Sequence, residues 1–140
     1  MFIDILLTVH IVGLMMAAGG GGGSAITMRE AAKRPPEQAG VLKTLGPAMA
    51  NFSAVGLGLM WFSGVALVFA KYDGLGALPA LFWVKMLFVT LLTLLAFATY
   101  LTYRQVKAGN VAAAARLPVL GPMSGVSSLV AVIFAVFAFH

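Results

Sequence analysis

Apolar residues follow one another along this chain in four long stretches, which short polar segments separate. The stretches cover about residues 2–28, 45–70, 78–103 and 114–140. Each exceeds the roughly 20 residues that an α-helix needs to cross about 30 Å of hydrocarbon. Because a backbone in lipid must satisfy its own hydrogen bonds, such stretches predict helices. We therefore expect an all-α protein, a four-transmembrane-helix bundle in which residues 1–140 form a single membrane domain.

Proline and glycine residues in and near the polar segments predict where helices start and where the chain turns. Two prolines at 35–36 interrupt the first segment, and the Gly-Pro pair at 46–47 is expected to open the second span. Pro79 is expected to start the third span, and the Gly-Asn pair at 109–110 predicts a turn before the fourth.

Composition and charge agree with a membrane protein. The chain is 61% hydrophobic and 9% charged, and the first span has no basic residue before it, so we interpret that span as retained rather than cleaved. Seven of the nine basic residues lie in the segments after spans one and three: Arg29, Lys33, Arg34, Lys43, Arg104, Lys107 and Arg116. The positive-inside rule then places both termini on the outer, periplasmic side of a bacterial inner membrane. The net charge of +5 thus reports topology, and nucleic acid is not an expected partner.

Five consecutive glycines lie inside the first span, within "MMAAGGGGGSAI". Helices in lipid associate through close contact of small residues, and small residues spaced four apart recur in spans one, two and four. The residues expected to pack helices together are Gly19, Gly20, Gly21, Gly23, Ser24, Gly58, Gly121 and Gly125. Three uses of the glycine tract stay open at this point: packing within the chain, a flat ligand such as a porphyrin or quinone, and the helix of a partner.

His10 and Lys85 are ionisable residues inside the spans, at similar expected depths near the outer side. Helical spacing from His10 reaches Gly13, Ala17 and Gly20, which predicts a small-residue face toward the interior. A buried cation is costly in a membrane, so we expect a binding site here, with His10 as ligand or proton acceptor and Lys85 pairing with an anionic group. The alternatives are a core hydrogen bond for His10 and snorkelling of Lys85 to the interface.

A metal site has few other donors. The chain has no cysteine, and its second histidine, His140, is expected at the membrane boundary. The eight methionines are more typical of core packing than of a Cu(I) site. Asp4 and Asp73 are expected near the outer surface, where either could pair with Lys71 or Lys85.

The segments "LLTVHIVGLMMAAGG" and "FWVKMLFVTLLTLLAFATYL" resemble small polytopic membrane proteins around the protoporphyrinogen oxidase HemJ and the copper-resistance protein CopD. The resemblance implies a redox role with bound haem b, and a cofactor site at His10, Gly20, Trp83 and Lys85 in which His10 is the metal ligand. Trp83 stands where that family has a histidine before the lysine, and "GGGSAIT" replaces its aromatic segment.

Two classes of function follow. One is a haem, porphyrin or metal protein of the HemJ and CopD kind. The other is a non-catalytic accessory subunit, either self-associating or docked through its glycine face on a larger respiratory or photosynthetic membrane complex. A transporter is a third class, which the absence of carboxylates within the spans disfavours.

Overall fold

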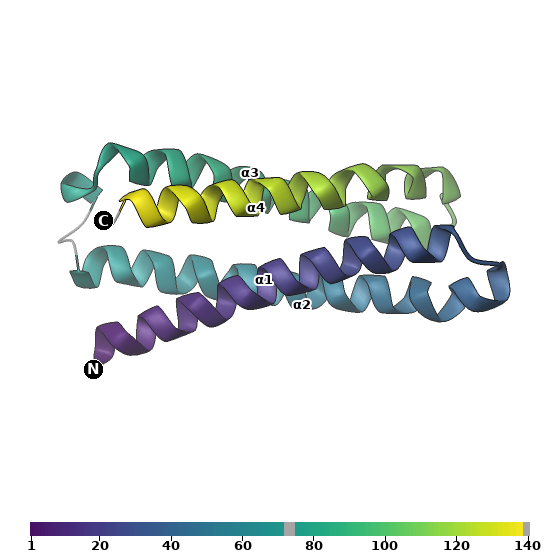
Figure 1. Cartoon of the computed structure of the whole chain (residues 1–140), viewed down its shortest axis with the longest axis horizontal. Helices are drawn as coiled ribbons and strands as arrows, with labels where there is room; N and C mark the ends of the chain where they lie inside the picture. The colour runs from purple at the N-terminus through teal and green to yellow at the C-terminus, as the bar shows by residue number, and fades with distance from the viewer. Residues whose placement is uncertain (72–74, 139–140) are drawn as a thin grey trace.

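The computed structural model describes residues 1–71 and 75–138, and its architecture is four long helices joined by short segments (Figure 1). The helices are α1 (Phe2–Ala32), α2 (Pro36–Lys71), α3 (Ala80–Lys107) and α4 (Leu117–Ala138), with 3₁₀ turns η1 (Leu75–Ala77) and η2 (Val111–Arg116). All four long helices are apolar enough to cross a membrane. The prediction of an all-α, multi-pass membrane protein is therefore confirmed.

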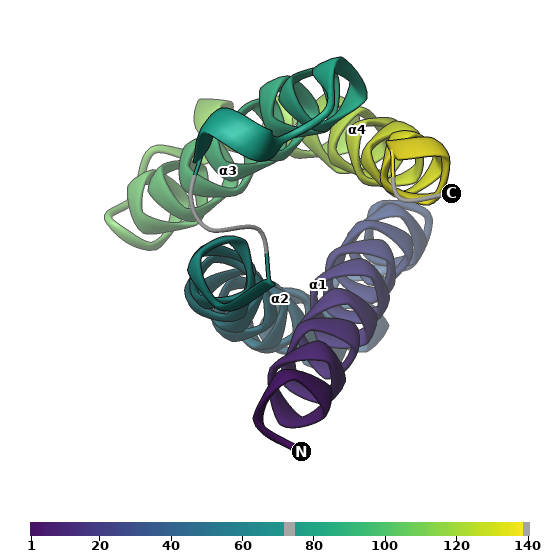
Figure 2. The ribbon, with the colours of Figure 1, turned by 90° about the vertical axis from the view of Figure 1, so that its left-hand side faces the viewer.

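The helices form two antiparallel pairs that lie side by side (Figure 1). Seen along the long axis, α1 and α2 make one pair and α3 and α4 the other, with all four arranged around a common centre (Figure 2). Contacts are most extensive between α1 and α2, and of the helices that lie next to one another around the centre, α2 and α3 have the fewest. One side of the molecule, between α2 and α3, is therefore loosely closed.

The helix that carries the second span begins earlier than the predicted apolar stretch. α2 begins at Pro36 rather than at 45, because a proline needs no backbone donor in the first turn of a helix. Pro47 lies inside α2 instead of opening it. At about 54 Å, a 36-residue helix is longer than the hydrocarbon layer, so its polar first turns extend beyond the apolar region.

The turn between α3 and α4 lies where the Gly-Asn pair predicts it. Gly109 adopts a φ of +99°, a conformation that side chains with a Cβ rarely tolerate. The chain then returns through η2, where Ala113 packs against the body of the protein at 3% exposure. α3 continues four residues past the predicted end of its span, to Lys107.

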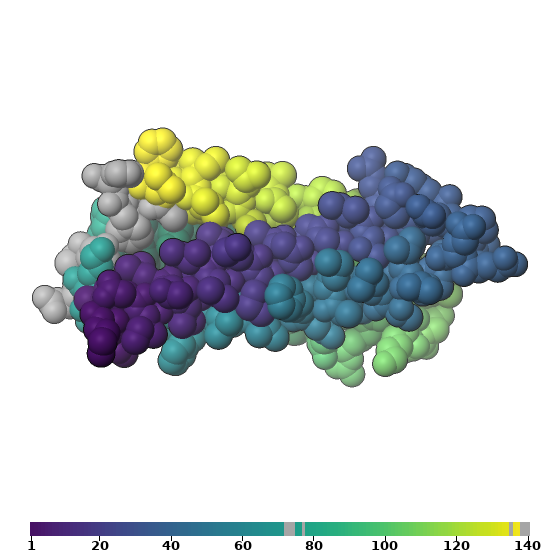
Figure 3. Space-filling model, turned by 60° about the horizontal axis from the view of Figure 1, so that its bottom comes forward, coloured from purple at the N-terminus to yellow at the C-terminus, as the bar shows by residue number. Residues whose placement is uncertain are grey.

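Apolar side chains cover much of the outside of the molecule, whose face with α1 and α2 in front is drawn in Figure 3. Met15, Phe62 and Leu87 each expose more than 60% of their surface. The interior is built instead from medium-sized and small residues such as Leu57, Met60 and Ala17. Lipid contact explains this distribution, because only the inner faces of the helices have protein neighbours.

Candidate functional site

His10 lies on α1 with its ring against α2. Its Nδ1 is 3.0 Å from Oγ of Ser63, whose side chain is fully buried. The Ser63 hydroxyl donates to the carbonyl of Leu59 at 2.6 Å, so its oxygen accepts the proton of His10 Nδ1. A Cβ at Gly64 would lie 3.3 Å from His10 Cε1, so a larger residue there would require the ring to shift by a few tenths of an ångström.

Lys85 lies on α3 at the same end of the molecule and is half-buried. Its Nζ is 5.9 Å from the centroid of the Phe82 ring, a cation–π distance. Lys85 also interacts electrostatically with His10. The structure thus brings the imidazole and the amine to one level, as parts of two different helices.

Trp83 is not brought into this arrangement. Half of its surface is exposed, and its ring stands edge-on to Phe82 with the centroids 5.7 Å apart. Its side chain therefore faces the surroundings of the protein rather than His10. Trp61 is the tryptophan that points inward, where its Nε1 donates to Thr93 Oγ1 at 3.0 Å.

The glycine tract is used mainly for packing within the chain. A Cβ at Gly20 would come within 2.7 Å of both Met49 O and Ser53 N in α2, so the two backbones are in contact there. Gly21 and Gly23 face side chains of the same two residues. Among the other expected packing residues, Gly121 meets Ala25, whereas Gly19, Gly58 and Gly125 have open space where a Cβ would stand.

This packing occupies the Gly20 side of the glycine tract, which was one side through which an accessory subunit could dock. Gly20 is buried against α2, and Gly19 and Gly22 are left as the open glycines of the tract. A helix of another protein therefore cannot reach the Gly20 face without displacing α2.

Hydroxyl groups tie the helices together along the interior. Ser24 Oγ lies 3.0 Å from Tyr103 Oη, which joins α1 to α3, and Ser53 Oγ donates to Ala17 O at 2.7 Å, which joins α2 to α1. Neither Ser53 nor Ser63 stands out in the sequence. Their only signal is a hydroxyl inside an apolar span, and that signal does not name a partner.

A cavity of about 90 Å³ lies between the two helix pairs. All four helices line it with small side chains, and its polar residues include Ser24, Asn51, Ser53, Thr99, Tyr100 and Ser124. Neither His10 nor Lys85 is part of its lining. The hollow is also far below the roughly 300 Å³ at which pockets for organic ligands begin.

The described residues thus give no support for a haem at His10 and Lys85. His10 supplies one nitrogen, and neither this cavity nor a second hollow beside the α3–α4 turn has His10 in its lining. In the described part of the chain no three His, Cys, Asp or Glu side chains come together as a metal site. His140 and Asp73, considered above as a second ligand and an ion-pair partner, lie outside the described residues.

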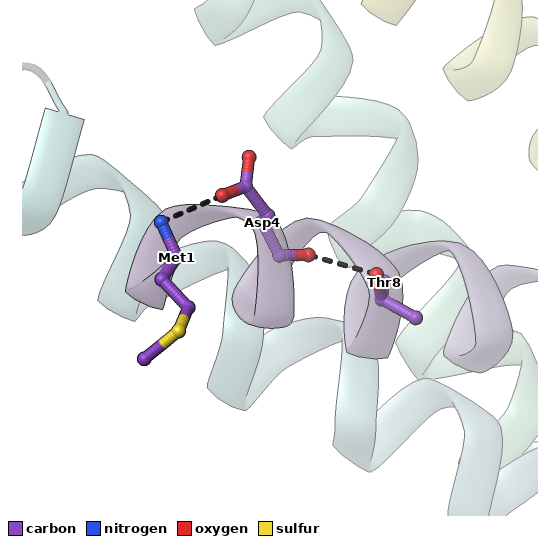
Figure 4. Close-up of polar contacts among 3 residues, drawn as sticks. All are labelled: Met1, Asp4 and Thr8. Carbon is purple, nitrogen blue, oxygen red and sulfur yellow. Dashed lines mark hydrogen bonds and ion pairs between the residues drawn. The ribbon is translucent and has the colours of Figure 1, made fainter.

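Asp4 does not pair with a lysine as expected. Its carboxylate lies 2.8 Å from the amino group of Met1, and its backbone carbonyl accepts a hydrogen bond from Thr8 (Figure 4). This local pairing keeps the carboxylate at the end of α1, apart from His10.

Comparison with known proteins gave no relative: no family model, no curated protein and no solved structure matches the chain.

Proposed function

We propose that this protein is a non-catalytic structural subunit within the membrane. We propose that it self-associates, and that the first contact it forms is with a second copy of the same chain. We further propose that it lies in a bacterial inner membrane with both termini on the periplasmic side, because the basic segments lie at the opposite end. The observation that carries the first proposal is the position of Asn51. Its side chain is exposed on α2, and it makes no hydrogen bond within residues 1–71 and 75–138.

Asn51 lies in the apolar part of α2, about 12 Å along the helix from Lys43. A carboxamide without a partner in hydrocarbon costs free energy, and asparagine inside a span favours association with another helix. The interior hydroxyls of this chain have internal partners, such as Ala17 O for Ser53 and Tyr103 for Ser24. Asn51 differs from them because its amide has no hydrogen-bond partner among the described residues, although it borders the same cavity.

The surroundings of Asn51 are open to a helix. We call the α2–α3 seam the surface formed by Asn51, Ala54, Ala96 and Tyr100, all of which border the cavity. Asn51 and Ala54 are exposed, and Tyr100 is 49% exposed. These residues lie on the loosely closed side of the molecule between α2 and α3. Small residues beside one polar group allow close approach of another backbone.

A second copy of the chain is the occupant that this surface favours. The amide of asparagine both donates and accepts, so Asn51 of two copies can satisfy each other across a two-fold axis. A partner with no polar group at this depth would leave Asn51 unsatisfied. The proposal therefore predicts a symmetric contact centred near Asn51.

Cysteine crosslinking in native membranes tests the contact, since the natural chain contains no cysteine. We expect Ala54→Cys, on the α2–α3 seam, to form a disulfide-linked dimer on oxidation. Met15→Cys is the matched control, because Met15 is 69% exposed on α1 away from the seam.

Variants of Asn51 test the chemistry in the Ala54→Cys background. Asn51→Gln retains the amide and should retain the dimer, whereas Asn51→Leu has a similar volume and should lose it. Equal crosslinking in Asn51→Leu, or in Met15→Cys, would refute the proposed contact. Loss of the dimer in Asn51→Gln as well as in Asn51→Leu would refute the amide pairing.

A further inference from the structure

A second hollow, of about 490 Å³, opens at the end of the molecule where α3 and α4 are joined. We call it the α3–α4 groove. Its walls are mostly apolar and include Leu101, Val119 and Leu120, while Gln105 and Arg116 supply the polar groups. The positive φ of Gly109 turns the chain back so that η2, which ends with Arg116, borders α3. The α3–α4 groove therefore combines an apolar wall with the guanidinium group of Arg116 at its edge.

The segment around the groove is basic and unneutralised. Residues 104–116 include Arg104, Lys107 and Arg116 and contain no aspartate or glutamate. In the part of the chain that the structure describes, none of these three cations forms an ion pair. Glu30, an acidic residue at the same end, pairs instead with Lys33 at 2.8 Å. An anionic group near Arg116 would thus meet cations that no aspartate or glutamate of the described residues neutralises by an ion pair.

We propose that the α3–α4 groove binds one anionic glycerophospholipid, with its phosphate at Arg116 and Gln105 and an acyl chain along Leu101, Val119 and Leu120. Charge complementarity and the apolar wall together select this occupant. A free phosphate would use only the polar edge, and a zwitterionic lipid would gain less from the cations. Basic pockets between membrane helices are known to hold acidic headgroups.

This inference is independent of the proposed self-association, because the groove and the α2–α3 seam share no lining residue. Lipid binding in the groove and self-association through Asn51 can therefore each be refuted without refuting the other. A lipid that binds to the monomer would be found whether or not Asn51 mediates a dimer.

The test is a lipid titration of delipidated protein in detergent, read by native mass spectrometry. Binding of phosphatidylglycerol is compared with binding of phosphatidylcholine. Inorganic phosphate is added as a competitor at the same molar concentration as the lipid. Arg116→Gln should weaken phosphatidylglycerol binding about fivefold, since one basic residue contributes about 1 kcal/mol toward an acidic headgroup. Arg34→Gln is the matched control, because it removes the same charge from the other basic segment outside the groove.

A second variant tests the apolar wall. Ala115→Leu fills part of the groove and keeps Arg116, so it should also weaken binding of phosphatidylglycerol. Both Ala115 and Arg116 are exposed, and far-UV circular dichroism checks that the variants keep their helices. Equal weakening by Arg116→Gln and Arg34→Gln would overturn the proposal, as would displacement of the lipid by inorganic phosphate or unchanged binding in Ala115→Leu.

Discussion

His10 of α1 and Ser63 of α2 are joined by a hydrogen bond of 3.0 Å, with the imidazole proton donated to a hydroxyl that is itself bonded to Leu59 O. The two residues are 53 positions apart, and Ser63 is completely buried. Their bond fixes how α1 lies on α2 at the end of the molecule that carries Lys85. It also gives His10 a structural role that needs no cofactor.

We therefore expect Ser63→Ala to destabilise the protein by about 0.5–1.5 kcal/mol, because it removes the hydrogen bond that joins α1 to α2 at His10. Thr8→Ala is the control: Thr8 is exposed and bonds only the carbonyl of its own helix, so it should change stability by less than about 0.5 kcal/mol. Thermal or SDS-induced unfolding in micelles measures both. In a double-mutant cycle with His10→Ala the two changes should not be additive, and additivity would show that the bond contributes nothing.

The purified protein should show no Soret band, because His10 is engaged by Ser63 and lines neither of the two hollows described above. An absorption spectrum with elemental analysis, taken directly after extraction in mild detergent, measures this. His10→Ala is compared with Trp83→Ala, whose side chain faces outward. A stoichiometric haem that disappears in His10→Ala and survives in Trp83→Ala would contradict the structural role and restore the HemJ-like hypothesis.

Substitution by alanine should change the stability of the protein differently at the adjacent glycines Gly19 and Gly20. At Gly20 the added Cβ would stand 2.7 Å from backbone atoms of α2, which cannot rotate away as a side chain can. We expect Gly20→Ala to cost about 1–3 kcal/mol through overpacking. At Gly19 nothing lies within 4 Å, so Gly19→Ala should be neutral or stabilise the helix by up to about 1 kcal/mol. Unfolding in micelles compares the pair, and equal effects would mean that the α1–α2 contact is not as close as described.

These pairs show where sequence reasoning succeeds and where it ends. The four spans follow from length and hydropathy alone, because hydrocarbon thickness imposes them. Which of two neighbouring glycines meets α2 depends on the rotation of α1 about its axis, and a step of one residue turns the helix by about 100°. The periodicity from His10 through Gly13, Ala17 and Gly20 identified that buried face.

The partner across the interface was not predictable in the same way. Ser63 is one of several hydroxyls inside spans, and its register against His10 depends on how two long helices cross. Likewise, Pro47 looks like a helix start in the sequence because it follows a glycine and a polar segment. The helix continues through it, since backbone groups freed by a proline can be satisfied in a membrane by neighbouring groups.

The orientation of the protein in the membrane can be measured by labelling introduced cysteines. Val41 and Gly109 lie at the end that carries the seven basic residues, and Gly76 lies at the opposite end, before α3. In this cysteine-free chain, Val41→Cys is expected to be protected from a membrane-impermeant maleimide in intact cells, and Gly76→Cys to be labelled. Permeabilised cells provide the control, because both thiols should then react; Gly109 is avoided, since its positive φ disfavours any other residue. Labelling of Val41→Cys but not of Gly76→Cys in intact cells would reverse the topology, and the positive charge would then have to be explained by something other than the positive-inside rule.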